Sequence, residues 1–261
     1  MKTSGVPNKA QAESVSRKIA FSALLAAERG TFAEKALNTE LSKTAVVAKD
    51  RALITELVYG VTRNRTRLDH IIGLYSKKPG KKISLTLRVI LRMGIYQLLE
   101  LDRIPPRAAV NESTLQARRM LTPAVAGMVN GLLRKVSSER NELLREPDDG
   151  IHELGNYYSH PEWLVERLIC QFGPARTKSI LKFNNSRPSL LLRVNTGKIS
   201  LKNFLALLEK QNISWNKDYP EFDSVELGSL SQPVASIEGF SSGLFLVQDF
   251  ASQIISGLLE I

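Results

Sequence analysis

The residues best placed to do chemistry in this chain are clusters of arginine and lysine. Three arginines alternate in the stretch TRNRTR, four lysines surround a Pro-Gly turn, and two further arginines lie one helical turn apart. These positions are Arg63, Arg65, Arg67, Lys77, Lys78, Lys81, Lys82, Arg88 and Arg92. Cations gathered at loops and helix ends can hold phosphates without reading bases. The alternative for any one of them is a solvated charge or an ion pair, with Glu56 and Asp69 as available partners.

The positive charge belongs to one half of the chain. Residues 1–140 hold 25 Lys and Arg against 11 Asp and Glu, whereas residues 141–261 hold 11 against 15, so the two halves carry net charges of +14 and −4. A polyanion is the natural partner of such a basic half, because each phosphate contact releases condensed counterions. A basic helical domain can also be merely soluble. The distribution of charge favours nucleic-acid binding by residues 1–140.

Metal and thiol chemistry find little support in the sequence. His70, His152 and His160 are scattered, and together with one cysteine they give no metal-ligand spacing. Cys170 lies seven residues after Trp163, on nearly the same helical face, and has no adjacent base. We therefore interpret Cys170 as a structural residue and predict no metal site, no catalytic residue and no cofactor-binding residue in this chain. A single cysteine also excludes an intramolecular disulfide framework.

The elements that position the basic clusters are helices. Apolar residues recur at helical spacing throughout residues 15–140, and no alternating strand pattern interrupts them. Pro105-Pro106 opens one helix, and Thr122-Pro123 supplies an N-cap followed by proline at the first helical position. Residues 1–14 lack the apolar core of a signal peptide and are expected to form a flexible polar tail. The sequence predicts an all-α bundle over residues 15–140.

The pattern changes after residue 140. Residues 141–158 are acidic and turn-rich, which is typical of a linker. Residues 159–261 begin with a helical connector broken at Gly173-Pro174 and continue as a small α+β, RRM-like unit. Its strands are expected at SLLLRVN, SVELG and LFLVQD, with a helix over 201–210 and an apolar helix at the end of the chain. Nothing follows this last helix, which suggests an opening toward a further domain.

Six phrases of the sequence, taken in order, carry a resemblance to a known family. DRALITELVYGVTRNRTRLDHII, LRMGIYQLLELDRIPPRAAVNES and GMVNGLLRKV resemble the NusB-like domain at the start of bacterial 16S ribosomal RNA cytosine-5 methyltransferases of the RsmB/Sun type. YYSHPEWLVERL, NNSRPSLLLRVNT and GLFLVQDFASQ are similar to the segment that precedes the catalytic domain of that family. The last three phrases separate the chain from free-standing NusB-type antitermination factors.

The resemblance implies an enzyme whose catalytic parts are missing from these 261 residues. The family uses a glycine-rich loop to hold S-adenosylmethionine and cysteine motifs to activate the cytosine base, and the sequence contains neither. It also suggests that the α+β unit helps to guide RNA, for which Arg187 and Arg193, around the strand SLLLRVN, are candidates. At Arg193, an ion pair within the protein is the favoured alternative.

The sequence therefore predicts a multidomain chain, with an all-α NusB-like bundle followed by a small α+β unit. Its predicted function is to bind 16S ribosomal RNA and position it for an S-adenosylmethionine-dependent cytosine-5 methyltransferase domain. The alternative is a stand-alone RNA-binding or assembly protein without catalysis. No apolar run approaches the roughly 20 residues of a membrane helix, so we expect a cytoplasmic protein with no membrane partner.

Overall fold

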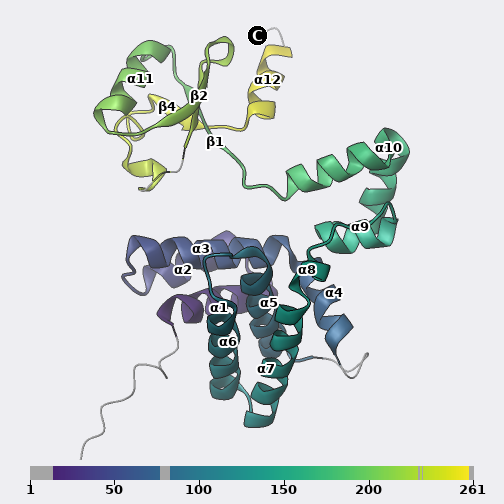
Figure 1. The fold of residues 1–261 in the computed structure, drawn as a ribbon. Helices are drawn as coiled ribbons and strands as arrows, with labels where there is room; N and C mark the ends of the chain where they lie inside the picture. Colours follow the sequence, from purple (N-terminus) through teal and green to yellow (C-terminus); the bar gives the residue numbers. More distant parts are fainter. Residues whose placement is uncertain (1–13, 77–82, 229, 231, 259–261) are drawn as a thin grey trace, which may run out of the picture. The chain divides into compact units, whose positions relative to one another are not determined.

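The helical spacing of apolar residues predicts the architecture of most of the chain. A computed structural model describes residues 14–76, 83–228, 230 and 232–258, with side chains described up to residue 255 (Figure 1). The chain divides into two compact units, unit 1 (Met1–Asn185) and unit 2 (Ser186–Ile261). Unit 1 carries a net charge of +12 and unit 2 of −2.

Unit 1 consists of helices throughout its described part, as its apolar periodicity predicts. Their bounds are α1 Val15–Glu28, α2 Ala33–Ser42, α3 Ala48–Arg63, α4 Arg65–Tyr75, α5 Leu85–Glu100, α6 Pro106–Met120, α7 Pro123–Ser138, α8 Arg140–Leu143, α9 Ile151–Tyr158 and α10 Glu162–Asn184.

Helix α5 is the centre of the bundle. It is apolar on nearly all sides, so it has to be surrounded, and α1, α3, α4, α6 and α7 all pack against it. Its residues Ile90 and Ile95 are completely buried, and so are Ile54 and Leu57 of α3. Helices α6 and α7 form an antiparallel pair, seen in Figure 1 at the lower end of unit 1.

The predicted helix starts are confirmed. Helix α6 begins at Pro106 with Pro105 in the N-cap position. At α7, the Thr122 hydroxyl accepts a hydrogen bond from the Val125 amide at 3.3 Å, and Pro123 occupies the first helical position. Both helices therefore start where the chain can satisfy or omit a free amide.

The region expected to be a linker contains a packed helix. Helix α9, within residues 141–158, buries Leu154 and Tyr158 in a small separate core with Val165 and Leu181 of α10. The acidic turn residues ahead of this helix hide its short apolar face, so the sequence pattern does not reveal it. Helices α9 and α10 both belong to unit 1, whereas we expected the connector to accompany the α+β unit.

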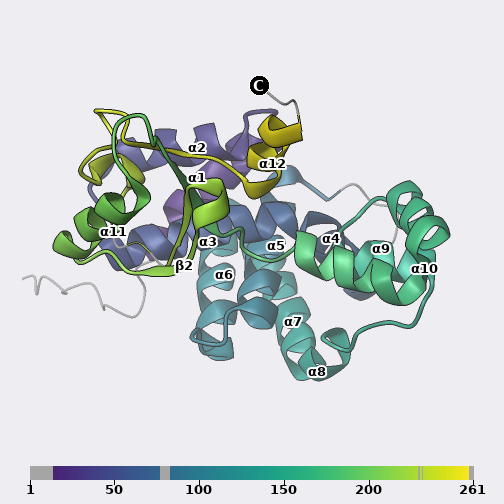
Figure 2. The same cartoon turned by 90° about the horizontal axis from the view of Figure 1, so that it is seen from above.

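The predicted break in α10 is present. Gly173 has φ +75° and ψ 167°, so two helical segments meet at an angle there, followed by Pro174. A left-handed φ suits glycine because it has no Cβ to clash with the backbone. Figure 2 shows the bend between the two segments.

Unit 2 is a four-stranded antiparallel sheet covered by helices. Its strands follow the order β2-β3-β1-β4, with β1 paired to both β3 and β4. The bounds are β1 Leu190–Val194, α11 Leu201–Lys210, β2 Trp215–Tyr219, β3 Ser224–Leu227, β4 Phe245–Val247 and α12 Phe250–Leu258, with short 3₁₀ turns at Pro220–Phe222 and Val234–Ser236.

One face of the sheet packs against α11. Phe204 and Leu208 of this helix meet Leu192, Val225 and Phe245 of the three strands in one buried core. Strand β2 is absent from our prediction because it is a polar edge strand, WNKDY, without apolar alternation. The helix, the other three strands and the α+β class are confirmed.

Helix α12 covers part of the opposite face. Ser224 of β3 donates a hydrogen bond to the Gln253 side chain, and the Phe250 ring lies 5.3 Å from that of Tyr219. The side chains of the terminal residues Leu258, Leu259 and Ile261 lie outside the part of the chain that the structure describes. Among the described helices, none is long and apolar enough to cross a membrane.

Candidate nucleic-acid interface

The three arginines of TRNRTR lie where α3 passes into α4. Helix α3 ends at Arg63, α4 begins at Arg65, and Asn64 between them donates its side-chain amide to the Gly60 carbonyl at 3.0 Å. The two helices turn about this single residue, so the three side chains leave the junction in different directions. Their environments differ accordingly, from exposed to buried.

Arg67 is buried and fully engaged within unit 1. Its guanidinium donates to Glu100 Oε1 at 2.9 Å and to the Leu143 carbonyl at 3.2 Å. It also stacks over the Tyr157 ring, 4.3 Å from the centroid. These contacts tie α4 to α5, α8 and α9, so we assign Arg67 to the structure of the bundle and not to a surface that meets RNA.

Arg92 is the most deeply buried charged side chain of the described core, 2% exposed. Its Nε and Nη2 donate to the two carboxylate oxygens of Asp69 at 2.7 and 2.6 Å, and its Nη1 lies 2.9 Å from Glu28 Oε1. Burial alone would lower the pKa of Arg92, but the two carboxylates raise it above its ordinary value. Asp69 was one of the two partners that the sequence offered.

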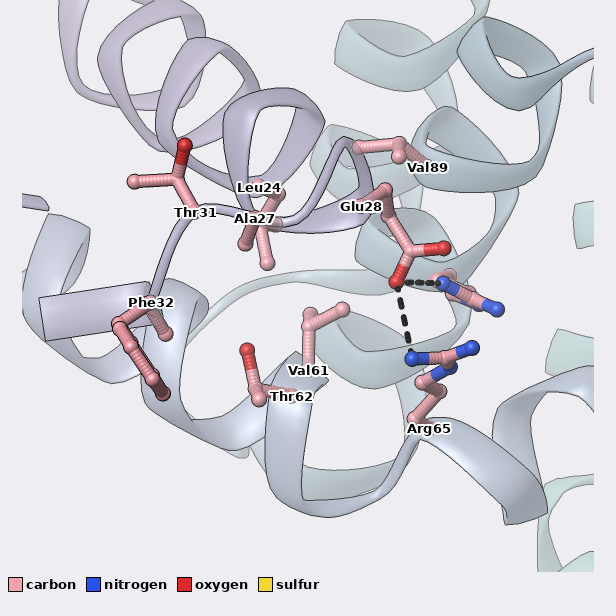
Figure 3. A pocket seen from close by; sticks show the side chains of 11 residues that line it. Leu24, Ala27, Glu28, Thr31, Phe32, Val61, Thr62, Arg65 and Val89 are labelled. Carbon is pink, nitrogen blue, oxygen red and sulfur yellow. Dashed lines mark ion pairs between the residues drawn. The ribbon is translucent and has the colours of Figure 1, made fainter. Parts of the chain in front are cut away.

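The same Glu28 reaches toward the junction of α3 and α4. Figure 3 shows Arg65 pointing at the Glu28 carboxylate, with Nη1 to Oε1 at 3.6 Å. The two residues border a hollow of about 190 Å³ whose floor is apolar, formed by Leu24, Ala27 and Val61. The Glu28 carboxylate lines this hollow, and its negative charge disfavours the binding of an anion there.

Three arginines of the predicted set have side chains that are exposed or half-buried at the surface of unit 1. The Arg65 side chain is 60% exposed and only loosely paired. Arg63 is half-buried and donates to the Asn185 carbonyl at a long 3.5 Å. Arg88 is half-buried and, within the described part of the chain, takes part in no ion pair. These three are the described arginines of the predicted set in unit 1 that remain available to a phosphate.

The other predicted residues fall into two groups. Lys77, Lys78, Lys81 and Lys82 lie outside the described residues. In unit 2, Arg187 is exposed ahead of β1, and Arg193 is half-buried within β1, where its guanidinium donates to Gln248 Oε1 at 3.3 Å. Arg193 thus has a hydrogen bond to an amide, where the sequence favoured an ion pair.

Two histidines face one another on α4 and α9. The rings of His70 and His152 are 6.4 Å apart and nearly perpendicular, beside a hollow of about 370 Å³. The Glu162 carboxylate, 2.6 Å from Nδ1 of His152, raises the pKa of His152. Burial, followed by the nearby His152, lowers the pKa of His70. The described residues contain no cluster of three side chains suited to a metal ion.

Cys170 does not have the packing role that we expected. It is exposed on the first segment of α10, and Trp163, on nearly the same face, is 64% exposed. The helix buries a different face, through Val165. The amphipathic face of α10 cannot be assigned from these two residues because large apolar side chains also occur at surfaces.

Family models match both units. Residues 14–138 match the NusB family, and residues 160–229 match the Methyltr_RsmF/B-like, ferredoxin-like domain. The chain is 36% identical to the ribosomal RNA small subunit methyltransferase B of Escherichia coli O1:K1 over 207 residues, 78% of this chain and 46% of the relative. It is 32% identical to the probable ribosomal RNA small subunit methyltransferase B of Synechocystis sp. over 232 residues, 89% of this chain and 52% of the relative.

The chain thus spans about half the length of the curated relatives that it matches. The crystal structure of PH0851 superposes on 95% of this chain and 56% of its own, with a TM-score of 0.64 and 20% identity. At that identity the likeness concerns the fold alone.

Proposed function

The chain carries a NusB-family domain followed by an RsmF/B-like ferredoxin-like domain and is homologous to ribosomal RNA small subunit methyltransferase B, and we propose that it is the RNA-binding region of such an enzyme. In this role it binds 16S ribosomal RNA and positions a cytosine for a methyltransferase domain that lies outside these 261 residues. The cofactor of that domain is S-adenosylmethionine, and the reaction is methylation at C5.

The observation that carries the proposal is the order of the two domains in one chain. A NusB-type domain alone would suit a stand-alone RNA-binding protein equally well. Residues 160–229 match the RsmF/B-like, ferredoxin-like methyltransferase domain, and a free NusB-type factor does not require such a domain. The charge division supports the same assignment, since unit 1 with +12 can approach a polyanion and unit 2 with −2 is nearly neutral.

The proposed binding is chiefly electrostatic. The described cations of unit 1 that remain available are Arg63 and Arg65 at the α3–α4 junction and Arg88 on α5, where they can meet phosphates. Arg187 and the lysines of residues 77–82 remain part of the proposal. Arg67 and Arg92 are not proposed to contact RNA, because their guanidinium groups donate to carboxylates inside the bundle.

Two measurements test the proposal. Binding of the whole chain to a labelled 16S ribosomal RNA hairpin can be followed by fluorescence anisotropy across a salt series. The logarithm of the affinity should fall linearly with the logarithm of the salt concentration. Incubation of the chain with the same RNA and labelled S-adenosylmethionine should give no methyl transfer. Absence of RNA binding at low salt would refute the proposed function, and protein-dependent methylation would refute the placement of catalysis in another domain.

A further inference from the structure

A second basic feature of unit 1 lies between α6 and α7, away from the predicted clusters. The two helices border an open groove of about 940 Å³. Each contributes three polar side chains at a spacing of four and then three residues, so each set lies on one helical face. These six residues are Arg107, Asn111 and Thr114 of α6 and Asn130, Arg134 and Ser137 of α7.

The cations of this groove are free, unlike those of the α3–α4 corner. Within the part of the chain that the structure describes, neither Arg107 nor Arg134 has an ion pair or a side-chain hydrogen bond, and both are exposed. No Asp or Glu occurs within four residues of either arginine, so no helical neighbour neutralises it. The sequence contained this signal, but the two positions are 27 residues apart and only the packing of α6 on α7 brings them to one groove.

The uncharged lining matches the cations. Asn111 and Asn130 have side-chain amides without a hydrogen-bond partner among the described residues, so each can donate to an anion, whereas the Thr114 hydroxyl already donates its proton to the Val110 carbonyl. The groove has no carboxylate in its lining, whereas the corner hollow contains Glu28 and the histidine hollow contains Glu142. The two arginines and the two asparagines of the lining can therefore all donate to an anion.

The position of Arg107 disfavours the helix that carries it. It stands in the first turn of α6, which has no acidic residue, and a cation there opposes the positive end of the helix dipole. An anion bound beside Arg107 would reverse this unfavourable term. The charge thus has a clear role only when the groove is occupied.

We propose that the α6–α7 groove binds the phosphodiester backbone of RNA, through Arg107 and Arg134 with Asn111 and Asn130 as supporting donors. This deepens the proposed function and rests on it. The groove lacks the aromatic rings on which unpaired bases stack, so it holds backbone and reads no base. It also lacks the aromatic, leucine or methionine anchor typical of a protein interface, which favours RNA over an acidic protein segment.

Single-charge variants of the whole chain test the groove. Arg107→Gln and Arg134→Gln should each weaken binding to a labelled 16S ribosomal RNA hairpin about tenfold, the cost of one hydrogen bond to a charged group. Each should also reduce the slope of log affinity against log salt by up to about one unit. The matched control is Arg51→Gln, an exposed arginine of α3 that removes the same charge elsewhere. Thermal unfolding should be unchanged for Arg134→Gln and Arg51→Gln, whose arginines have no partner among the described residues, and unchanged or slightly raised for Arg107→Gln, which removes an unfavourable cation from the first turn of α6.

A second pair of variants keeps the arginines and changes the lining. Asn111→Asp places a carboxylate in the groove at constant size and should weaken RNA binding, whereas Asn38→Asp, the same change on the exposed side of α2, should have a much smaller effect. Addition of inorganic phosphate at constant ionic strength should displace little RNA, because the groove holds one part of a continuous chain.

The outcomes separate the two proposals. A wild-type chain that does not bind the hairpin would overturn both the proposed function and the groove. Wild-type binding with equal losses for Arg51→Gln and Arg107→Gln would overturn the groove alone and leave diffuse attraction by unit 1. Efficient displacement of RNA by inorganic phosphate would likewise overturn it, in favour of a site for a small anion.

Discussion

Replacing Arg92 with methionine tests whether a cationic residue of the predicted set serves the fold or the RNA. The substitution keeps most of the side-chain volume and removes three donors, two to Asp69 and one to Glu28. Breaking a fully buried pair on one side costs about 3–5 kcal/mol, because a charge is left without a partner. Here the Asp69 side chain is 38% exposed and can regain water, while that of Glu28 is only 13% exposed.

The expected loss of stability is therefore about 2–4 kcal/mol, somewhat below the fully buried case. For a unit of this size that corresponds to a fall in Tm of about 5–15 °C. Arg65→Gln is the matched control, because this residue contacts the same Glu28 at 3.6 Å from an exposed position. We expect it to change the stability by less than about 1 kcal/mol.

Urea denaturation followed by circular dichroism measures the loss, and an RNA salt series on the same proteins measures binding. Arg92→Met should lower the midpoint of unfolding and leave the salt slope of the folded protein unchanged. Arg65→Gln should leave the midpoint of unfolding almost unchanged and reduce the salt slope by up to about one unit. An Arg92→Met protein of wild-type stability with a reduced salt slope would refute our assignment of Arg92 to the structure.

Three further predictions concern the helices and the charge. Gly60→Ala should destabilise unit 1 by about 1–2 kcal/mol in urea unfolding, because the added Cβ would lie 2.1 Å from the Tyr96 ring and this clash outweighs the gain in helix propensity. Gly73→Ala, where the added Cβ meets open space, should be neutral or stabilising. A Gly73→Ala protein less stable than the Gly60→Ala protein would contradict this reasoning. In NMR titrations, His152 should titrate above the ordinary pKa of 6.5 and His70 below it, so on acidification His152 gains its proton first; two coincident titrations near 6.5 would disprove the described contact. Residues 14–185 alone should keep most non-specific RNA affinity and residues 186–261 little, measured on one hairpin; equal affinities would exclude our charge argument.

The local features of this chain follow from its sequence. Helix starts at Pro106 and Pro123, the break at Gly173, and helix α11 from Leu201 to Lys210 all lie where proline, glycine and apolar spacing predict them. Each of these signals acts through the backbone of a few neighbouring residues, so no distant contact is needed to interpret it. The family resemblance has the same character, because it depends on the order of six short phrases along the chain.

The role of each arginine was decided only by tertiary structure. Arg65 and Arg67 are two residues apart in one cluster, yet the first is exposed and the second is enclosed by partners from α5, α8 and α9. Arg107 and Arg134 look isolated in sequence and lie on one groove because α6 folds back on α7. Whether a cation is free or paired depends on carboxylates and carbonyls that are distant along the chain, and composition and spacing carry no information about those distances.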